Sequence, residues 1–166
     1  MDQSRLVIGN DGWEYSSGDL WTLHIYEGES HSIENRLQKL MQEPSSSITG
    51  EVESGGYRTG ALPGADVKGL PILLTECGGV GFTTATLAGD EFAYGDLPNS
   101  AEELLTRFNL VAASINEAAG LSGYVWTQLT DVQQEINGLL YFDRTPKLPL
   151  EQIRTVMLSI GKRLDN

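Results

Sequence analysis

The sequence has little that would anchor the chain covalently or in a membrane. Its 166 residues include a single cysteine, Cys77, so an internal disulfide framework is excluded. No stretch approaches the roughly 18 consecutive apolar residues of a membrane span, and residues 1–5 do not resemble the start of a signal peptide. We therefore expect a soluble, cytoplasmic chain with no membrane partner. If it is cut from a longer protein, the targeting signal lies on the missing part.

Basic residues and nucleotide-binding motifs are also scarce. The chain has 11 Lys and Arg against 23 Asp and Glu, a net charge of −12. Such a surface repels phosphate backbones, which argues against nucleic acid as a partner. The sequence has no Gly-x-Gly-x-x-Gly or P-loop lysine motif, and no cluster of His, Cys or paired acids at metal-ligand spacing. We therefore expect neither a cofactor nor a metal.

Apolar patterning predicts an α/β fold. Strands are expected at four apolar segments: 5–9, 20–26, 70–79 and 123–127. The third, opened by a proline and closed by two glycines, is typical of a strand buried on both faces. Apolar residues at helical spacing predict helices over 32–41, from a capping box at Ser100 to Gly120, and from Pro149 onward. This alternation indicates a parallel sheet with helices outside it.

Acidic and aromatic side chains follow two of these strands. Glu76 ends the third, where α/β folds keep their chemistry, so it is the first catalytic candidate. The alternative is a strand-end glutamate that forms a salt bridge or meets solvent. His24 and Tyr26 end the second strand on one face, which suits a ligand-facing rim, although such a histidine is more often structural. Alternation turns Cys77 away from the face of Glu76, so a cysteine nucleophile is not expected.

Several motifs together resemble the catalytic domain of glycoside hydrolase family 2, the β-galactosidase and β-glucuronidase group. The resemblance covers about residues 6–160 and is carried by these stretches: Asn10-Asp11-Gly12-Trp13-Glu14, His24-x-Tyr26, Pro71 to Gly79, Gly123 to Val132, Asn137-Gly138-Leu139 and Asp143 to Lys147. The motifs after residue 122 are the specific ones. The Thr-Glu-x-Gly-Gly element would be weak on its own.

The resemblance implies a (β/α)8 TIM barrel of which the four predicted strands are strands 5–8, a C-terminal half. Glu76 matches the family's nucleophile. By the same resemblance, the substrate pocket would be lined by Trp126, His24, Tyr26, Asp11 and Trp13. The acid/base carboxyl would lie ahead of residue 1, so this chain alone is expected to be inactive. A core position for Trp126 is the alternative.

The resemblance also bears on substrate and partners. Glucuronidases of the family hold the sugar carboxylate with an Asn-x-Lys pair, and this chain has Glu135-Ile136-Asn137 there. A neutral, galactoside-like β-glycoside is therefore expected. The expected partners are a carbohydrate substrate and either the missing N-terminal half of the barrel or a second copy of the chain. A non-catalytic, sugar-binding or scaffold half barrel is the alternative function.

Four loop acids are possible substitutes for the missing acid/base: Asp11, Glu14, Asp131 and Glu135. Such acids more often cap turns or pair with cations such as Arg144.

Overall fold

The computed structural model of the chain describes residues 4–26, 32–46, 58–84, 91–93 and 96–161. The elements follow in the order β1 (Trp21–Ile25), α1 (Ser32–Gln42), β2 (Ile72–Gly78), α2 (Ala101–Glu117), β3 (Leu121–Thr127) and α3 (Leu150–Ser159). The chain divides into two compact units, and each is described by itself. Unit 1 comprises Met1–Ile25, Ile33–Cys77 and Ala118–Val125; unit 2 comprises Tyr26–Ser32, Gly78–Glu117 and Trp126–Asn166.

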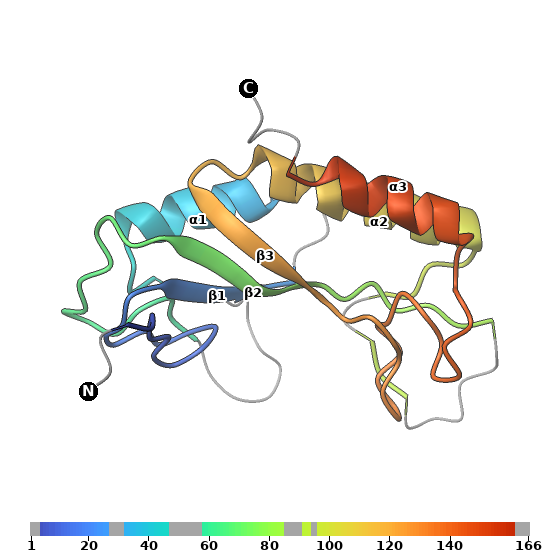
Figure 1. Cartoon of the computed structure of the whole chain (residues 1–166), viewed down its shortest axis with the longest axis horizontal. Helices are drawn as coiled ribbons and strands as arrows, with labels where there is room; N and C mark the ends of the chain where they lie inside the picture. Colours follow the sequence, from blue (N-terminus) through green and yellow to red (C-terminus); the bar gives the residue numbers. More distant parts are fainter. Residues whose placement is uncertain (1–3, 27–31, 47–57, 85–90, 94–95, 162–166) are drawn as a thin grey trace. The chain divides into compact units, whose positions relative to one another are not determined.

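Unit 1 is built on the sheet. The strand order is β1-β2-β3, and β1 pairs with β2 in parallel. The helix α1 runs along one side of this sheet (Figure 1). The prediction of α/β architecture with parallel strands is therefore confirmed, as are the second, third and fourth predicted strands and the helix that begins at Ser32.

The apolar face of β1 forms the core of unit 1. Trp21, Leu23 and Ile25 are buried, as are the α1 residues that fall at helical spacing, Ile33, Leu37 and Leu40. The indole Nε1 of Trp21 also donates to the carbonyl oxygen of Gly60 at 3.0 Å, so its polar atom is satisfied. Full burial of each of these side chains contributes about 1.5–3 kcal/mol to stability. This packing holds β1 firmly under the helix.

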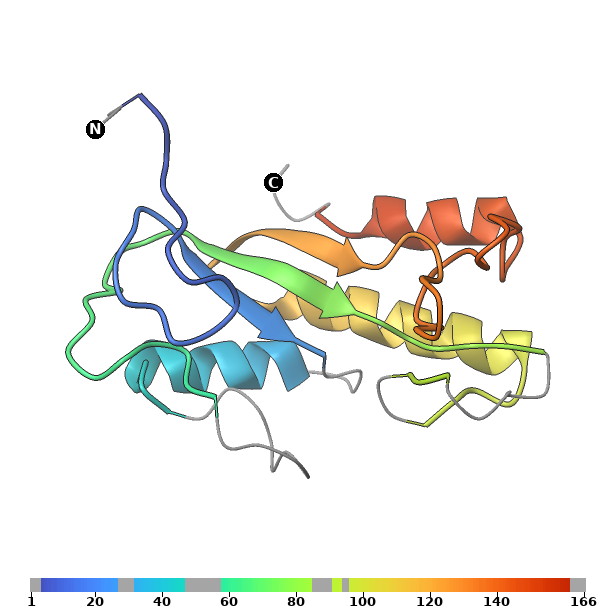
Figure 2. The ribbon, with the colours of Figure 1, turned by 90° about the horizontal axis from the view of Figure 1, so that it is seen from below.

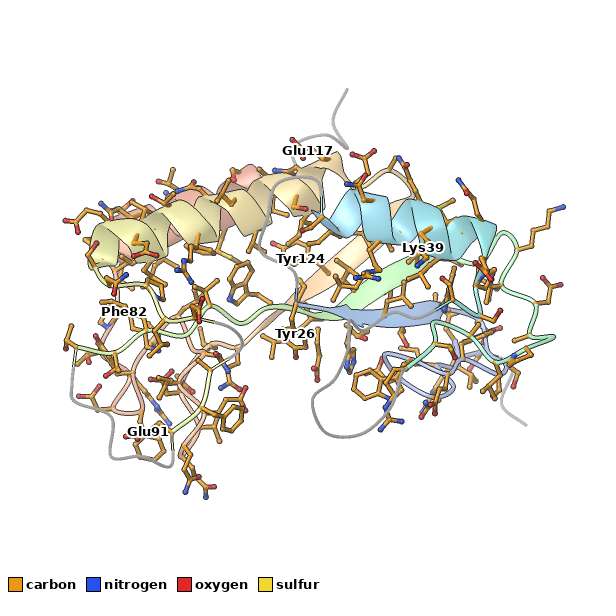
Figure 3. The ribbon with its side chains drawn as sticks, turned by 180° about the vertical axis from the view of Figure 1, so that it is seen from behind. Tyr26, Lys39, Phe82, Glu91, Glu117 and Tyr124 are labelled. Carbon is orange, nitrogen blue, oxygen red and sulfur yellow. The ribbon has the colours of Figure 1, made fainter. Side chains whose placement is uncertain are left out.

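Burial of β2 is one-sided, which differs from the expectation of two buried faces. Ile72, Leu74 and Cys77 are buried, whereas Leu73, Thr75 and Glu76 are half-buried. The physical reason is that α1 covers only one side of the sheet in unit 1 (Figure 3). The other side is therefore accessible where β2 ends.

The prediction of a buried strand at residues 5–9 is wrong. This segment makes one isolated parallel bridge, between Ile8 and Leu20, and hydrogen bonds between Val7 and Asp19. Leu6 is 71% exposed and Val7 55%. The segment lies beside the start of β1, and its apolar side chains are exposed instead of buried.

Unit 2 is organised around α2 and α3, which pack side by side (Figure 2). Its core cluster consists of Phe82, Leu104, Phe108, Ala112, Leu148 and Val156. Phe82 lies under α2 (Figure 3). The apolar residues at helical spacing in α2 are buried, as the pattern predicts. In α3 the same spacing predicts a buried face that includes Leu150, but this side chain, the first of the helix after the N-cap residue Pro149, is 62% exposed.

The ends of α2 follow local sequence signals. Ser100 Oγ accepts a hydrogen bond from the backbone N–H of Glu103 at 3.1 Å, as a capping box requires. The Glu103 carboxylate reaches back one residue further than expected, to the backbone N–H of Asn99 at 2.8 Å. The helix ends at Glu117, and Gly120 takes a φ of +86° in the turn that leads to β3.

A buried ion pair holds the loop between β3 and α3. Lys147 Nζ donates to Asp131 Oδ1 at 2.6 Å and to the carbonyl oxygen of Ile136 at 2.9 Å, and the Gly138 N–H also donates to Asp131 Oδ1. The side chains of Lys147 and Asp131 are only 1% and 6% exposed. Burial lowers the pKa of Lys147, and the hydrogen bond and charge of Asp131 oppose that shift. Asp131 therefore pairs with a cation, as loop acids more often do, and the cation is Lys147.

Among the described residues, no helix combines the length and the apolar composition that crossing a bilayer requires.

Loss of the Lys147 charge tests this ion pair. Lys147→Met leaves Asp131 buried without its cation, so we expect a loss of about 3–5 kcal/mol in the free energy of unfolding. Urea unfolding followed by circular dichroism measures it. The double variant Lys147→Met/Asp131→Leu removes both charges and should lose clearly less. Equal losses in both variants would contradict a role for the ion pair.

Candidate functional site

A β-bulge places Glu76 at the end of β2. Cα partners run in step from Trp21–Ile72 to Leu23–Leu74, but His24 then pairs with Glu76, and the register shifts at this point. Thr75 is therefore the extra residue of the bulge. An extra residue of this kind changes the direction in which the side chains that follow it point.

The bulge changes which residues share a face. Simple alternation from the buried Leu74 would bury Glu76, yet Cys77 is the next fully buried residue and Glu76 is 39% exposed. The Cys77 thiol donates to the carbonyl oxygen of Val125, and burial raises its pKa to about 12. A thiol with this pKa is protonated near neutral pH and is a poor nucleophile.

His24 lies between two carboxylates. Its Nδ1 is 3.3 Å from Glu76 Oε2, and its Nε2 is 3.3 Å from Asp11 Oδ2. The Nε2 contact has hydrogen-bond geometry. The Nδ1 contact is an electrostatic one, because Nδ1 has no hydrogen bond to any described residue. The imidazole side chain is only 9% exposed, so its position is fixed by packing.

Asp11 has several hydrogen-bond donors. Thr75 Oγ1 donates to Asp11 Oδ1 at 2.6 Å, and Thr22 and His24 also bond to this carboxylate. Partial burial raises the pKa of Asp11, but the hydrogen bonds from Thr75, Thr22 and His24 and the charge of His24 outweigh it, so the pKa lies below its ordinary value. Asp11 is therefore a carboxylate at neutral pH.

The loop that carries Asp11 is held against β1. The Gly12 N–H donates to Thr22 Oγ1 at 3.2 Å, and the His24 N–H donates to the carbonyl oxygen of Gly12 at 3.1 Å. Gly12 has a φ of +87°, and a Cβ added there would lie 2.5 Å from the His24 ring. Only glycine fits between the loop and the imidazole.

Trp13 and Arg58 extend the site beyond His24. The Trp13 ring meets the His24 ring edge-on, with centroids 4.9 Å apart. The Arg58 guanidinium lies 5.2 Å from the centre of the Trp13 ring and 3.3 Å from Glu14 Oε1. The connection between α1 and β2 leads from a helix back to a strand, and such connections are expected on the N-terminal face of a parallel sheet, away from the chemistry. Here the backbone N–H of Glu14 donates to the carbonyl oxygen of Thr59 at 2.7 Å, which brings this part of the connection to Trp13 instead.

Four of the six predicted site residues thus lie together in unit 1: Glu76, His24, Asp11 and Trp13. Tyr26 and Trp126 belong to unit 2 and are half-buried. The Trp126 ring meets Phe108 edge-on at 4.7 Å and packs against the core cluster, and an added Cβ at Gly78 would lie 2.6 Å from it. Its Nε1 is buried with no hydrogen-bond partner among the described residues.

Thr75 and Thr22 are site residues that sequence reasoning missed. Both hydroxyls bond to the Asp11 carboxylate. For Thr22 a signal existed, because alternation in β1 puts it on the face of His24. For Thr75 there was none, because a regular strand would turn it away from Glu76. Within the part of the chain that the structure describes, no group of three or more acidic, His or Cys side chains is arranged to hold a metal ion.

Comparisons with known proteins support the fold. No protein-family model matches the chain, and no curated protein matches it. Crystal structures of a GH2 β-galacturonidase from Eisenbergiella tayi, bound to glycerol and to galacturonate, each match with a TM-score of 0.56 at 19% sequence identity. Each match covers 87% of this chain and 24% of the enzyme chain.

A β-glucuronidase from Faecalibacterium prausnitzii matches with a TM-score of 0.40 at 19% identity, over 55% of this chain and 16% of that chain. This TM-score is too low to carry weight. The chain is therefore similar in fold to part of a GH2 enzyme, and it spans about a quarter of the length of the galacturonidase structures.

The lowered pKa of Asp11 predicts how stability depends on pH. A carboxyl whose pKa is lower in the folded state stabilises the fold above its ordinary value of 3.8, and this contribution is lost as the pH falls through the lowered folded-state value. We expect the wild type to be more stable than Asp11→Asn near pH 6, and the difference to disappear in acid. Thermal unfolding across a pH series measures it. A difference that does not change with pH would contradict the ionised state of Asp11.

Proposed function

We propose that the chain is the C-terminal half, strands 5–8, of a (β/α)8 catalytic domain of a retaining β-glycosidase. In this proposal β1, β2 and β3 correspond to strands 6–8, and residues 5–9, which make one isolated bridge to Leu20, correspond to strand 5. Glu76 is the nucleophile. The substrate is a neutral, galactoside-like β-glycoside. The proposal rests chiefly on one observation: the bulge turns the strand-end carboxylate of Glu76 onto the accessible side of the sheet, beside His24. The similarity in fold to a GH2 enzyme supports it at the level of architecture.

Retaining glycosidases use two carboxyl groups about 5–5.5 Å apart. In the first step an oxygen of Glu76 bonds to the anomeric carbon while the bond from that carbon to the leaving oxygen breaks. The leaving oxygen takes its electron pair and accepts a proton from the second carboxyl group. In the second step that group, now a carboxylate, removes a proton from water. The water oxygen attacks the anomeric carbon and releases Glu76.

The second carboxyl group needs a raised pKa, so that it is protonated when substrate binds. Asp11 does not suit this role, because its pKa is lowered. Glu14 pairs with Arg58 at 3.3 Å. The other two loop acids also have partners: Asp131 pairs with the buried Lys147, and Glu135 Oε1 accepts a hydrogen bond from Asn137 Nδ2 at 3.3 Å. We therefore assign the acid/base to a carboxyl group outside this chain, on the remaining part of the barrel. Without it, reaction of ordinary substrates is slower by about 10²–10⁴-fold.

The charges near Glu76 support a neutral sugar. Asp11 is ionised, and the nearby cation Arg58 is already paired with Glu14. An anionic sugar would therefore be repelled by the negative charge of Asp11. The galacturonate in the Eisenbergiella tayi enzyme is a ligand of that protein. In this proposal His24, Asp11 and Trp13 line the sugar site within unit 1.

Covalent labelling tests Glu76 directly. A 2,4-dinitrophenyl 2-deoxy-2-fluoro-β-galactoside has a leaving group that departs without protonation, so the missing acid/base is not needed. We expect one dinitrophenolate to be released per chain and one fluorosugar to be attached to Glu76, as measured by absorbance and by peptide mass spectrometry. Glu76→Gln should abolish both signals. Glu151→Gln, on the surface of α3, is the matched control and should react as the wild type does.

Three results would decide against parts of this proposal. A label on another residue would overturn the assignment of Glu76. Binding of galactosides without any label would favour the non-catalytic, sugar-binding half barrel. Faster labelling by the corresponding β-galacturonide than by the β-galactoside would overturn the neutral substrate.

A further inference from the structure

We infer that Asp11 is the positioning residue of Glu76. Its carboxylate holds the two groups that flank Glu76, the Thr75 bulge and the His24 ring, and so fixes the direction in which the Glu76 carboxylate points. This inference rests on the proposed function of Glu76. It gives Asp11 a role beyond lining the sugar site, because Asp11 then acts through other side chains.

The first connection runs through the backbone. Thr75 precedes Glu76 and is the extra residue of the bulge. Its hydroxyl donates to Asp11 Oδ1 at 2.6 Å, a short, charge-assisted hydrogen bond. A regular strand would turn Thr75 to the opposite side from Glu76. The bond to Asp11 therefore stabilises the bulged backbone that aims Glu76.

The second connection runs through the imidazole. Asp11 Oδ2 bonds to Nε2 of His24 at 3.3 Å, and Nδ1 of the same ring lies 3.3 Å from Glu76 Oε2. Gly12 packs against the ring and leaves no space for a Cβ, so the ring cannot swing toward the loop. Asp11 thus sets the orientation of the ring that Glu76 meets.

The Glu76 side chain is 39% exposed, so packing alone does not select one of its staggered rotamers. A nucleophile must approach the anomeric carbon in line with the bond that breaks, and a displacement of about 1 Å can cost on the order of 10²-fold in rate. Asp11 holds both neighbours of Glu76 with one carboxylate. Loss of the bond between Asp11 and Thr75 should therefore lower the rate of attack rather than the binding of the sugar.

The test is the rate of labelling by the dinitrophenyl fluorogalactoside in Thr75→Val and Asp11→Asn. We expect each variant to slow the rate constant at saturating reagent by on the order of 10²-fold. The half-saturating concentration of Thr75→Val should stay close to that of the wild type, and one label per chain should still form. Thr75→Ser keeps the hydroxyl and should recover most of the rate.

Thr145→Val is the matched control. Thr145 Oγ1 also donates to an aspartate, Asp143 Oδ1, at 2.6 Å in an exposed loop. Its loss should leave the rate unchanged. If Thr75→Val and Asp11→Asn label at the wild-type rate, or if fewer chains react at an unchanged rate constant, Asp11 is not a positioning residue but at most a structural one.

A second measurement does not depend on activity, so it separates this inference from the proposed function. The chain has only 2 histidines, which makes the ring signals of His24 easy to assign by NMR. Glu76→Gln should shift the ring ¹⁵N signals of His24 in the wild-type background and shift them much less in Asp11→Asn. An equal shift in both backgrounds would overturn the inference. Absence of labelling in the wild type with the expected NMR result would instead overturn only the proposed function.

Discussion

One extra residue in β2 is the constraint on which the candidate site depends. Because Thr75 is inserted relative to β1, the apolar series of β2 passes from Leu74 to Cys77 rather than to Glu76. The same shift satisfies two opposing demands. The sheet keeps a buried apolar face toward α1, and a carboxylate that would be costly to bury emerges on the other side. A regular strand with this sequence would have placed Glu76 in the core and Cys77 at the site.

Ionisable side chains of this chain lie in three different environments. Asp11 is surrounded by donors, so its pKa falls and it serves as a fixed negative charge. Cys77 lies two residues beyond Thr75, the extra residue of the bulge, and burial raises the pKa of its thiol to about 12. Asp131 is buried, but Lys147 and the Gly138 N–H compensate it. Hydrogen-bond donors thus keep Asp11 ionised, and apolar surroundings keep the Cys77 thiol protonated.

Local signals made much of the fold predictable. The start of α2 was clear because Ser100 and Glu103 satisfy backbone groups within one turn, and β1 was clear because its alternation has one purely apolar face. The prediction of a buried strand at residues 5–9 was wrong, because an apolar run does not reveal whether another element covers it. Its side chains are exposed beside β1. The bulge could not be predicted, because the hydrogen bond that its extra residue makes joins residues 64 positions apart. The contact of Arg58 with Trp13 and the choice of Lys147 by Asp131 depend on tertiary structure in the same way.

The close contact between Gly12 and the His24 ring has an evolutionary consequence. Any side chain at this position would collide with the His24 ring, and the ring in turn contacts both Asp11 and Glu76. Selection therefore acts on these positions as a group rather than one by one. Distant homologues should retain or lose the Asp-Gly dipeptide, the histidine and the Thr-Glu pair together. Such a joint pattern would identify this geometry even where the overall identity is too low to align the chains.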